Sequence, residues 1–242
     1  MEAVDRAVLA AIGAATPVVL LSSTINSPTS LDIINQLLVK FPGSRHVMVD
    51  AVSYDGMLSA NLASYGKRMI PSYRFDKAKT IVGIGADFLG TWLSPIEFAS
   101  QYAVGKKINE SAPSMSHHIQ FETVASLSGS NADDRYLHRP SETGAIALAL
   151  LSAINGQGAT NITDAALKTG IEKTAKELLA NKGASLVVCG SNDMNVQVIV
   201  NAINEAIGAN GNTIDWSIAA KYKQGNDADF SKLLDDMNAG SV

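Results

Sequence analysis

Polar and charged residues follow several apolar stretches of this chain, at positions where strands would end. Ser22 and Ser23 follow one stretch, Gly85 and Asp87 follow another, and Arg139 follows a third. In an open α/β sheet, ligands bind at the carboxyl ends of parallel strands. These residues therefore indicate a ligand-facing edge. The chemistry they offer is binding, because the sequence gives no distance that would pair two carboxylates for acid–base catalysis.

Three glycines, Gly83, Gly85 and Gly90, suggest at first a dinucleotide-binding turn. Their spacing is wrong for that turn, and they do not lie in the first strand–helix connection, so a nicotinamide cofactor is not expected. Two interpretations stay open. The glycines could simply allow close backbone packing, or they could form a loop whose amides face a phosphate near a helix N-terminus.

The histidines and the cysteine favour structural roles. His117 and His118 are adjacent within an expected strand, so their side chains point to opposite faces and do not readily share a metal ion. Cys189 is the single cysteine and follows an apolar strand, which predicts a buried packing residue. One cysteine excludes an intrachain disulfide and an all-cysteine iron–sulfur site within this chain.

The composition describes a globular chain with a sizeable interior. It has 242 residues, of which 46% are hydrophobic and 17% are charged, and a net charge of -4. Basic residues occur only in isolated pairs such as 67–68 and 106–107, so a nucleic-acid surface is not expected. No apolar run approaches the roughly twenty residues that a membrane-spanning helix needs, so we expect no direct membrane insertion.

Apolar strands and amphipathic helices alternate along the chain. Strands are predicted near 18–21, 46–49, 80–84, 117–124, 136–138 and 186–188, and helices near 3–14, 31–38, 58–65, 95–104, 143–154, 165–179, 196–207 and 230–237. This order predicts an α/β fold, Rossmann-like, with a mostly parallel sheet flanked by helices. We expect two α/β regions, 1–160 and 161–242, with the second packing on the first.

Short motifs at the strand ends resemble a known family. Residues 84–88 (IGADF), the pair Ala132-Asp133 and residues 139–146 (RPSETGAI) are similar in order and spacing to motifs of the molybdopterin oxidoreductases, the dimethylsulfoxide reductase superfamily. Residues 53–66, 115–133 and 233–240 resemble the molybdopterin-oxidoreductase-like part of the large iron–sulfur subunit of bacterial alternative complex III. The similarity covers nearly the whole chain, as a middle piece of a longer polypeptide.

This resemblance implies a function for the longer protein. The chain would be a scaffold within a quinol-oxidising electron-transfer complex on the periplasmic side of the cytoplasmic membrane. Its partners would be the remaining domains of the parent subunit and other subunits of a membrane-associated respiratory complex. Iron–sulfur clusters of the parent would lie outside this chain, which we expect to be inactive alone and to hold no cofactor itself.

The resemblance also implies a nucleotide-binding turn. The family contacts the nucleotide half of molybdopterin guanine dinucleotide where this chain has Asp87, Thr91 and Trp92. The chain departs from the family at 121–123, where an Asp-Pro-Arg-like turn is usual, and at 141–143, where Gly-Thr-Asp is usual, so the pterin site is expected to be degenerate. The expected cofactor-binding residues are Ser22, Ser23, Gly85, Asp87, Thr91, Trp92, Glu122 and Arg139. No catalytic residue or metal ligand is expected.

Two alternatives stay open at this point. The chain could be the cofactor-binding domain of a true molybdopterin guanine dinucleotide enzyme. It could also be a small-ligand-binding module that uses the sheet edge near Ser22, Gly85 and Ser191. The module predicts a stable monomer with a closed core, whereas a piece of a larger protein predicts an exposed apolar patch where other domains dock.

Overall fold

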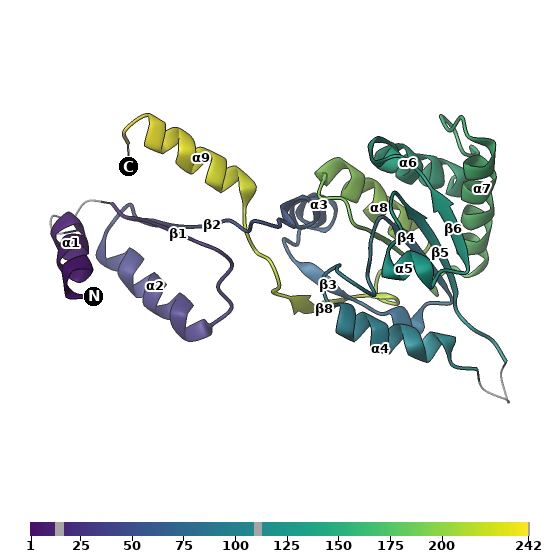
Figure 1. Cartoon of the computed structure of the whole chain (residues 1–242), viewed down its shortest axis with the longest axis horizontal. Coiled ribbons are helices and arrows are strands. Elements are labelled where there is room, and N and C mark those ends of the chain that lie inside the picture. The colour runs from purple at the N-terminus through teal and green to yellow at the C-terminus, as the bar shows by residue number, and fades with distance from the viewer. Residues whose placement is uncertain (13–16, 109–112, 242) are drawn as a thin grey trace. The chain divides into compact units, whose positions relative to one another are not determined.

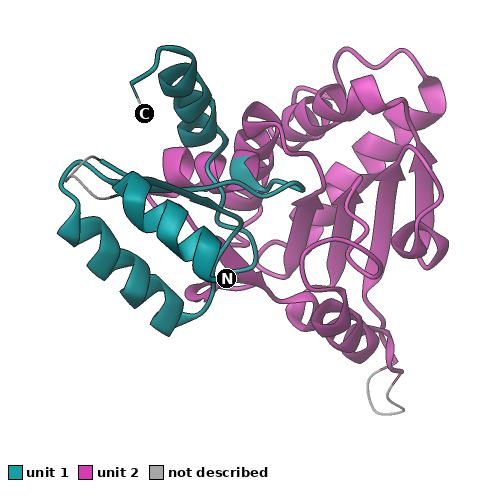
Figure 2. Cartoon of the chain, turned by 60° about the vertical axis from the view of Figure 1, so that its left-hand side comes forward, with its two compact units in different colours: residues 1–55, 221–242 teal, residues 56–220 magenta. Residues whose placement is uncertain are grey.

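The chain forms two compact units in a computed structural model that describes residues 1–12, 17–108 and 113–241. Unit 1 consists of Met1–Asp55 and Lys221–Val242, and unit 2 is the continuous segment Gly56–Ala220 (Figure 2). These units group the chain by spatial contact. The division at residue 160 that the sequence indicates stays a prediction.

A four-stranded parallel sheet organises unit 2. Its strands are β4 (Thr80–Ile84), β5 (His117–Glu122), β6 (Asp134–Leu137) and β7 (Ser185–Cys189), in the spatial order β6-β5-β4-β7 (Figure 1). Every residue of β4 and β7 is buried. A strand that is apolar on both faces needs cover on both faces, which is typical of parallel sheets. The predicted α/β fold with a mostly parallel, helix-flanked sheet is confirmed.

Helices connect the strands of unit 2 and cover the sheet. They are α3 (Asp55–Tyr65, with Asp55 in unit 1), α4 (Pro95–Lys106), the short α5 (Leu127–Ser130), α6 (Thr143–Ile154), α7 (Ala165–Ala180) and α8 (Met194–Ala206). The short 3₁₀ segments η1 (Phe75–Lys77) and η2 (Pro140–Glu142) precede β4 and α6. The order β6-β5-β4-β7 places the reversal of strand order between β4 and β7.

The helix boundaries follow from capping side chains. Asp164 Oδ1 accepts a hydrogen bond of 2.8 Å from the Leu167 amide and begins α7. Asp193 Oδ1 accepts one of 2.7 Å from the Asn195 amide and begins α8. Beyond α8, Gly208 has a φ of +68°, a left-handed conformation that glycine adopts readily after a helix.

A second pairing in unit 2 is antiparallel and was not expected from the sequence. Strand β3 (Ile70–Tyr73) pairs with β8 (Ile214–Ala220), and the register shifts between Pro71 and Ser72. Pro71 has no amide hydrogen for a ladder, so proline within a short run argues against a strand in sequence analysis. The partner lies more than a hundred residues away, which local periodicity does not reveal.

Unit 1 has little interior of its own. Its elements are α1 (Glu2–Ile12), the parallel strands β1 (Val19–Ser22) and β2 (Arg45–Met48), α2 (Pro28–Lys40) and α9 (Asp227–Asn238). Among its described residues, Val47 and Leu233 are the only buried hydrophobic side chains. Strands expected near 18–21 and 46–49 are confirmed, while part of the helix expected at 3–14 lies outside the described residues. No helix in the described ranges is long and apolar enough to cross a membrane.

An aromatic cluster on one face of β5 encloses His118. Phe75 stacks on Phe88 with ring centroids 4.4 Å apart, and Phe88 lies 5.0 Å from the His118 ring. The Tyr102 hydroxyl lies 3.2 Å from Nδ1 of this histidine, which is fully buried. Burial lowers the pKa of His118 to about 4. His118 is therefore neutral at physiological pH and packs as part of the core.

This depressed pKa predicts an acid-sensitive fold. The unfolded chain binds a proton on this residue below a pH of about 6.5, whereas the folded chain does so only near pH 4. Stability is therefore complete above that range and falls as the pH drops through it, by about 3 kcal/mol at most. Urea unfolding between pH 7 and pH 4 should show a smaller decline for His118→Gln than for the wild type. An equal decline in both would contradict the assignment.

Candidate functional site

The four parallel strands of unit 2 end at one edge of the sheet. Gly85 follows β4, Thr123 follows β5, His138 follows β6 and Gly190 follows β7. Open α/β sheets bind ligands beyond this edge, where the strand order reverses. In this sheet the reversal lies between β4 and β7. A ligand site is therefore expected at the loops that follow these two strands.

Backbone packing brings these two loops into direct contact. A Cβ atom added to Gly190 would lie 2.2 Å from the Gly85 carbonyl oxygen, and one added to Gly56 would lie 1.9 Å from the Asn192 carbonyl oxygen. Gly85 has a φ of +62°, which turns the chain sharply after β4. Within β4, a Cβ on Gly83 would lie 1.9 Å from Gln120 Oε1. Close packing is thus the role that the structure supports for Gly83.

Asp87 holds the loop after β5 in place. Its Oδ1 accepts hydrogen bonds of 2.9 Å from both the amide and the hydroxyl of Ser128, and its Oδ2 accepts one of 3.3 Å from Thr91. Trp92 is buried and packs on Tyr73, with ring centroids 5.3 Å apart. The carboxylate of Asp87 therefore binds groups of the chain itself.

Glu122 lies buried at the end of β5 and holds the same loop. One carboxylate oxygen accepts a hydrogen bond of 2.5 Å from Ser126, and the other pairs with Arg135 of β6. Gly129 lies against this carboxylate, since a Cβ there would be 2.0 Å from Oε1. Asp87 and Glu122 thus bind two nearby serines, Ser128 within α5 and Ser126 at its N-cap.

A cavity of about 480 Å³ opens beyond β6. Among the residues that line it are His138, Arg139, Glu142 and Asp164. Nδ1 of His138 lies 2.8 Å from the Arg139 carbonyl, which only accepts hydrogen bonds, so Nδ1 carries a proton. Nε2 is buried and has no partner among the described residues. Glu142 accepts the Arg139 amide at 2.8 Å, and Asp164 caps α7, so each of these carboxylates has one structural hydrogen bond.

The two serines expected to contact a cofactor belong to unit 1. Ser22 ends β1, and its hydroxyl lies 2.8 Å from Nε2 of His46 and 2.7 Å from the Ser23 carbonyl, to which it donates. Beside them, buried Asp50 accepts hydrogen bonds from Thr24 and from the Gly225 amide. Burial by itself raises the pKa of Asp50, but these hydrogen bonds lower it below its usual value. Of the eight expected residues, Gly85, Asp87, Thr91 and Trp92 share one loop, while Glu122 ends β5 and Arg139 lies shortly after the neighbouring strand β6.

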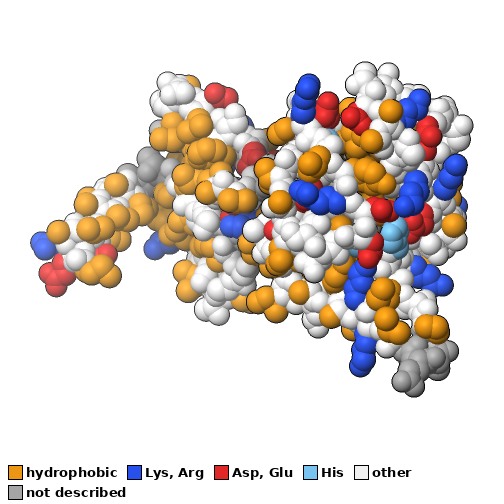
Figure 3. All heavy atoms as spheres, turned by 45° about the vertical axis from the view of Figure 1, so that its right-hand side comes forward, with side chains coloured by type: hydrophobic (Ala, Val, Ile, Leu, Met, Phe, Trp, Pro, Cys, Tyr) orange, Lys and Arg blue, Asp and Glu red, His pale blue; other side chains and the backbone are white. Residues whose placement is uncertain are grey.

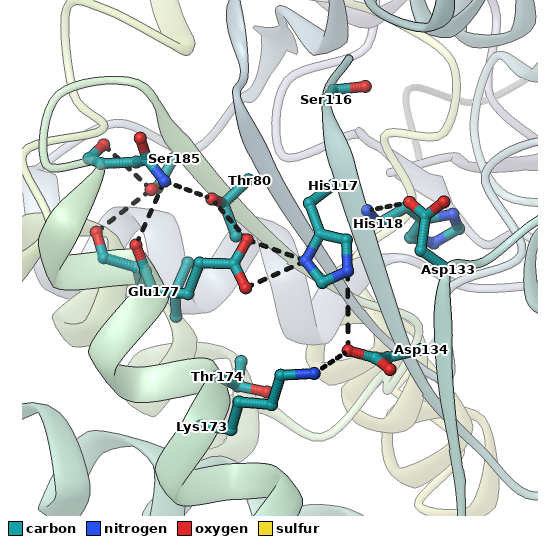
Figure 4. Close-up of polar contacts among 12 residues, drawn as sticks. Thr80, Ser116, His117, His118, Asp133, Asp134, Lys173, Thr174, Glu177 and Ser185 are labelled. Atoms are coloured by element: carbon teal, nitrogen blue, oxygen red, sulfur yellow. Dashed lines mark hydrogen bonds and ion pairs between the residues drawn. The ribbon is translucent and has the colours of Figure 1, made fainter. Parts of the chain in front are cut away.

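Sequence reasoning missed a second polar cluster, at the amino ends of the strands (Figure 4). His117 Nδ1 lies 2.8 and 2.9 Å from the two oxygens of Glu177 in α7, and its Nε2 lies 3.5 Å from Asp134. Lys173 bonds the same Asp134 at 2.7 Å, and Thr80 donates to Glu177 at 3.2 Å. Figure 3 shows a histidine among acidic side chains at the surface. Adjacent His117 and His118 do point to opposite faces, but the partners of His117 come from distant sequence positions.

No family model matches this sequence, and no curated protein matches it either. Its fold is similar to that of a solved enzyme complex. The X-ray crystal structure of the formyltransferase/hydrolase complex (FhcABCD) from Methylorubrum extorquens, in complex with methylofuran, matches with a TM-score of 0.58 and 15% sequence identity. The match covers 84% of this chain and 54% of that one, so this chain spans about half the length of the chain it matches. At this identity the likeness shows the fold alone.

This finding corrects the family expected from the sequence. The matched structure is a formyltransferase/hydrolase complex, so the assignment to the molybdopterin oxidoreductases and to the iron–sulfur subunit of alternative complex III is wrong. The expected scaffold role in quinol-oxidising electron transfer is wrong for the same reason. Two of the motifs behind it, residues 84–88 and 139–146, contain the turns at the carboxyl ends of parallel strands. Such turns report the geometry of a sheet edge, which many unrelated functions share.

Other expectations stay predictions. They are the absence of a bound cofactor in this chain, a periplasmic location, and a cofactor-binding role for the eight residues Ser22, Ser23, Gly85, Asp87, Thr91, Trp92, Glu122 and Arg139. The structure gives most of these side chains partners within the chain, as described above.

The contacts of Asp87 predict a structural role that mutation can measure. Asp87→Ala removes the acceptor for the amide and the hydroxyl of fully buried Ser128, and should lower the free energy of unfolding by about 1–3 kcal/mol. Asp87→Asn keeps Oδ1 as an acceptor and is the matched control, with a smaller expected loss. Urea denaturation of both variants is the measurement. Equal stability of Asp87→Ala and the wild type would show that these hydrogen bonds do not hold the loop.

Proposed function

We propose that this chain is a module of a larger multi-subunit assembly, in which unit 2 is the stable α/β domain and unit 1 is the docking part. One observation carries the proposal: unit 1 exposes apolar side chains that a stable unit would bury. Its helix α1 has no buried residue, although Val4 is 63% and Leu9 is 69% exposed. In α2, which also buries none, Ile33 and Val39 are 62% and 82% exposed.

The sheet of unit 1 is also incomplete by itself. Two parallel strands, β1 and β2, pair only with each other among the described residues. An isolated two-stranded sheet is marginal in water, and parallel strands usually occur in sheets that are covered on both faces. Leu21 in β1 is 51% exposed. Many exposed apolar side chains within one small unit favour an interaction site.

The structural comparison supports the same proposal without identifying the partner. The similar structure is described as a complex of formyltransferase and hydrolase, so a related fold works there inside an assembly. A free-standing ligand-binding module would instead be a monomer with a closed core. Val47 and Leu233, the two buried hydrophobic residues in the described part of unit 1, do not make such a core. We therefore favour a subunit role over the free-standing module.

Hydrogen exchange should separate the two units in the isolated chain. The amide hydrogens of unit 1 should exchange at least about a hundredfold faster than those of unit 2. An example is the Val49 amide, which donates to the Ser22 carbonyl at 2.9 Å. The bond from Gly190 N–H to the Ile84 carbonyl, at 3.0 Å, is the internal reference. In the native assembly, purified through a tag on this chain, the unit 1 amides should become protected.

A pair of charge substitutions provides the control for that experiment. Leu9→Glu should weaken the association of this chain with its assembly, whereas Ile96→Glu should not, because Ile96 is an exposed residue of unit 2. Size-exclusion chromatography of the tagged assembly reads out both. If the amides of unit 1 are as protected as those of β4 and β5 in a monomer, the cover comes from within the chain and the proposal is wrong.

A further inference from the structure

A hollow of about 530 Å³ lies at the amino ends of β4 and β5, on the edge of the sheet opposite the candidate site described above. Its lining includes Lys77, Lys79, Lys107, Ser116, His117 and Glu177. The volume is within the range of small-molecule sites. Basic side chains are present on the face that Figure 3 shows, beside the exposed histidine.

Three lysines line this hollow, from two separate segments of the chain. Lys77 ends η1, Lys79 precedes β4, and Lys107 follows α4. All three are exposed, and no hydrogen bond or ion pair joins them to a carboxylate among the described residues. In the sequence, Lys107 belongs to an isolated basic pair and gives no sign of a cluster. The fold brings the three lysines to the lining of one hollow.

The acidic groups of the same lining are already paired. Asp76 accepts two hydrogen bonds from Arg74, at 3.0 and 2.8 Å, and the pKa of Asp76 is lowered by these bonds. Glu177 holds His117 at 2.8 and 2.9 Å. Lys77 also contributes, by its charge, to lowering the pKa of Asp76. The three lysines still outnumber these two carboxylates in the lining of the hollow. The hollow keeps an excess of positive charge.

A purely structural role for these lysines would be to balance the charge at the C-terminus of a helix. Helices α4 and α7 end at this edge, and basic side chains often balance the partial negative charge of helix C-termini. Lys106 lies in the last turn of α4, where its charge has this effect, and it also donates to the Ser116 carbonyl at 2.8 Å and pairs with Asp133. In addition, the hydroxyl of Ser116 is buried, with 6% of the residue exposed, and has no partner among the described residues.

We propose that this hollow binds a multiply charged anion of the phosphate class, a phosphorylated small molecule or a polyphosphate, through Lys77, Lys79 and Lys107. Lysine binds phosphate as a point charge, without the fixed geometry that arginine imposes. Because the three ammonium groups are exposed, their attraction for an anion is screened by salt. Binding is therefore tighter at low ionic strength and favours higher ligand charge.

Isothermal titration of the full chain with inorganic pyrophosphate tests this. The wild type should bind at low salt, and binding should weaken as sodium chloride is added. The double variant Lys79→Ala/Lys107→Ala should bind about tenfold more weakly or worse. Lys79→Arg/Lys107→Arg should retain binding. The charge-matched control is Lys168→Ala/Lys176→Ala, which removes two exposed lysines of α7 outside the hollow and should leave the affinity unchanged.

A further variant tests which edge of the sheet binds the anion. Arg139→Ala alters the cavity beyond β6 and should have no effect on pyrophosphate binding. Circular dichroism of each variant confirms that it is folded. The proposal is overturned if the wild type does not bind pyrophosphate, if the Lys79/Lys107 alanine variant binds as well as the wild type, or if only Arg139→Ala abolishes binding.

Discussion

The buried central strand β4 is the constraint on which unit 2 depends. It pairs with β5 on one side and β7 on the other, and none of its residues reaches solvent. Both faces must therefore be covered by helices, and the parallel connections place every strand end at one of two opposite edges. The chemistry that this unit offers depends on how the polar groups at these two edges are paired.

The two edges differ in how completely their charges are paired. At the carboxyl edge, Asp87 and Glu122 bind Ser128, Ser126 and Arg135, and together they anchor the segment around α5. The loops after β4 and β7 are in backbone contact. At the amino edge, Asp76 and Glu177 accept hydrogen bonds, whereas Lys77, Lys79 and Lys107 make no hydrogen bond or ion pair with the described residues. Buried polar groups in native proteins are almost always paired, so pairing at the carboxyl edge is expected of any stable fold. An excess of positive charge in one hollow, by contrast, is not expected from folding stability alone.

Much of the fold could be predicted from the sequence, because the signals are local. Strand β4 and the helix at 143–154 have the bounds expected from their apolar residues, and β7 extends one residue beyond the expected 186–188 at each end. The pairing of β3 with β8 could not be predicted, because Pro71 interrupts the short apolar run of β3 and because β8 is distant in the sequence. Asp87 and Glu122 were selected through the family resemblance, whereas their hydrogen-bond partners, which lie 4 to 41 residues away in the chain, could not be predicted. The family assignment failed because it rested on strand-end turns.

The contrast between the two units carries a thermodynamic consequence. Ordering one residue costs roughly 1–2 kcal/mol of backbone entropy, and burying one large apolar side chain returns about 1.5–3 kcal/mol. Unit 1 buries Val47 and Leu233 among its described hydrophobic residues, which does not offset the ordering of its five helices and strands. A helix of 11 residues without any buried side chain, such as α1, is marginal by itself in water. If unit 1 orders only on docking, part of the interaction energy is consumed in folding it. The interface would then be specific in shape while its affinity stays modest for the area that it buries.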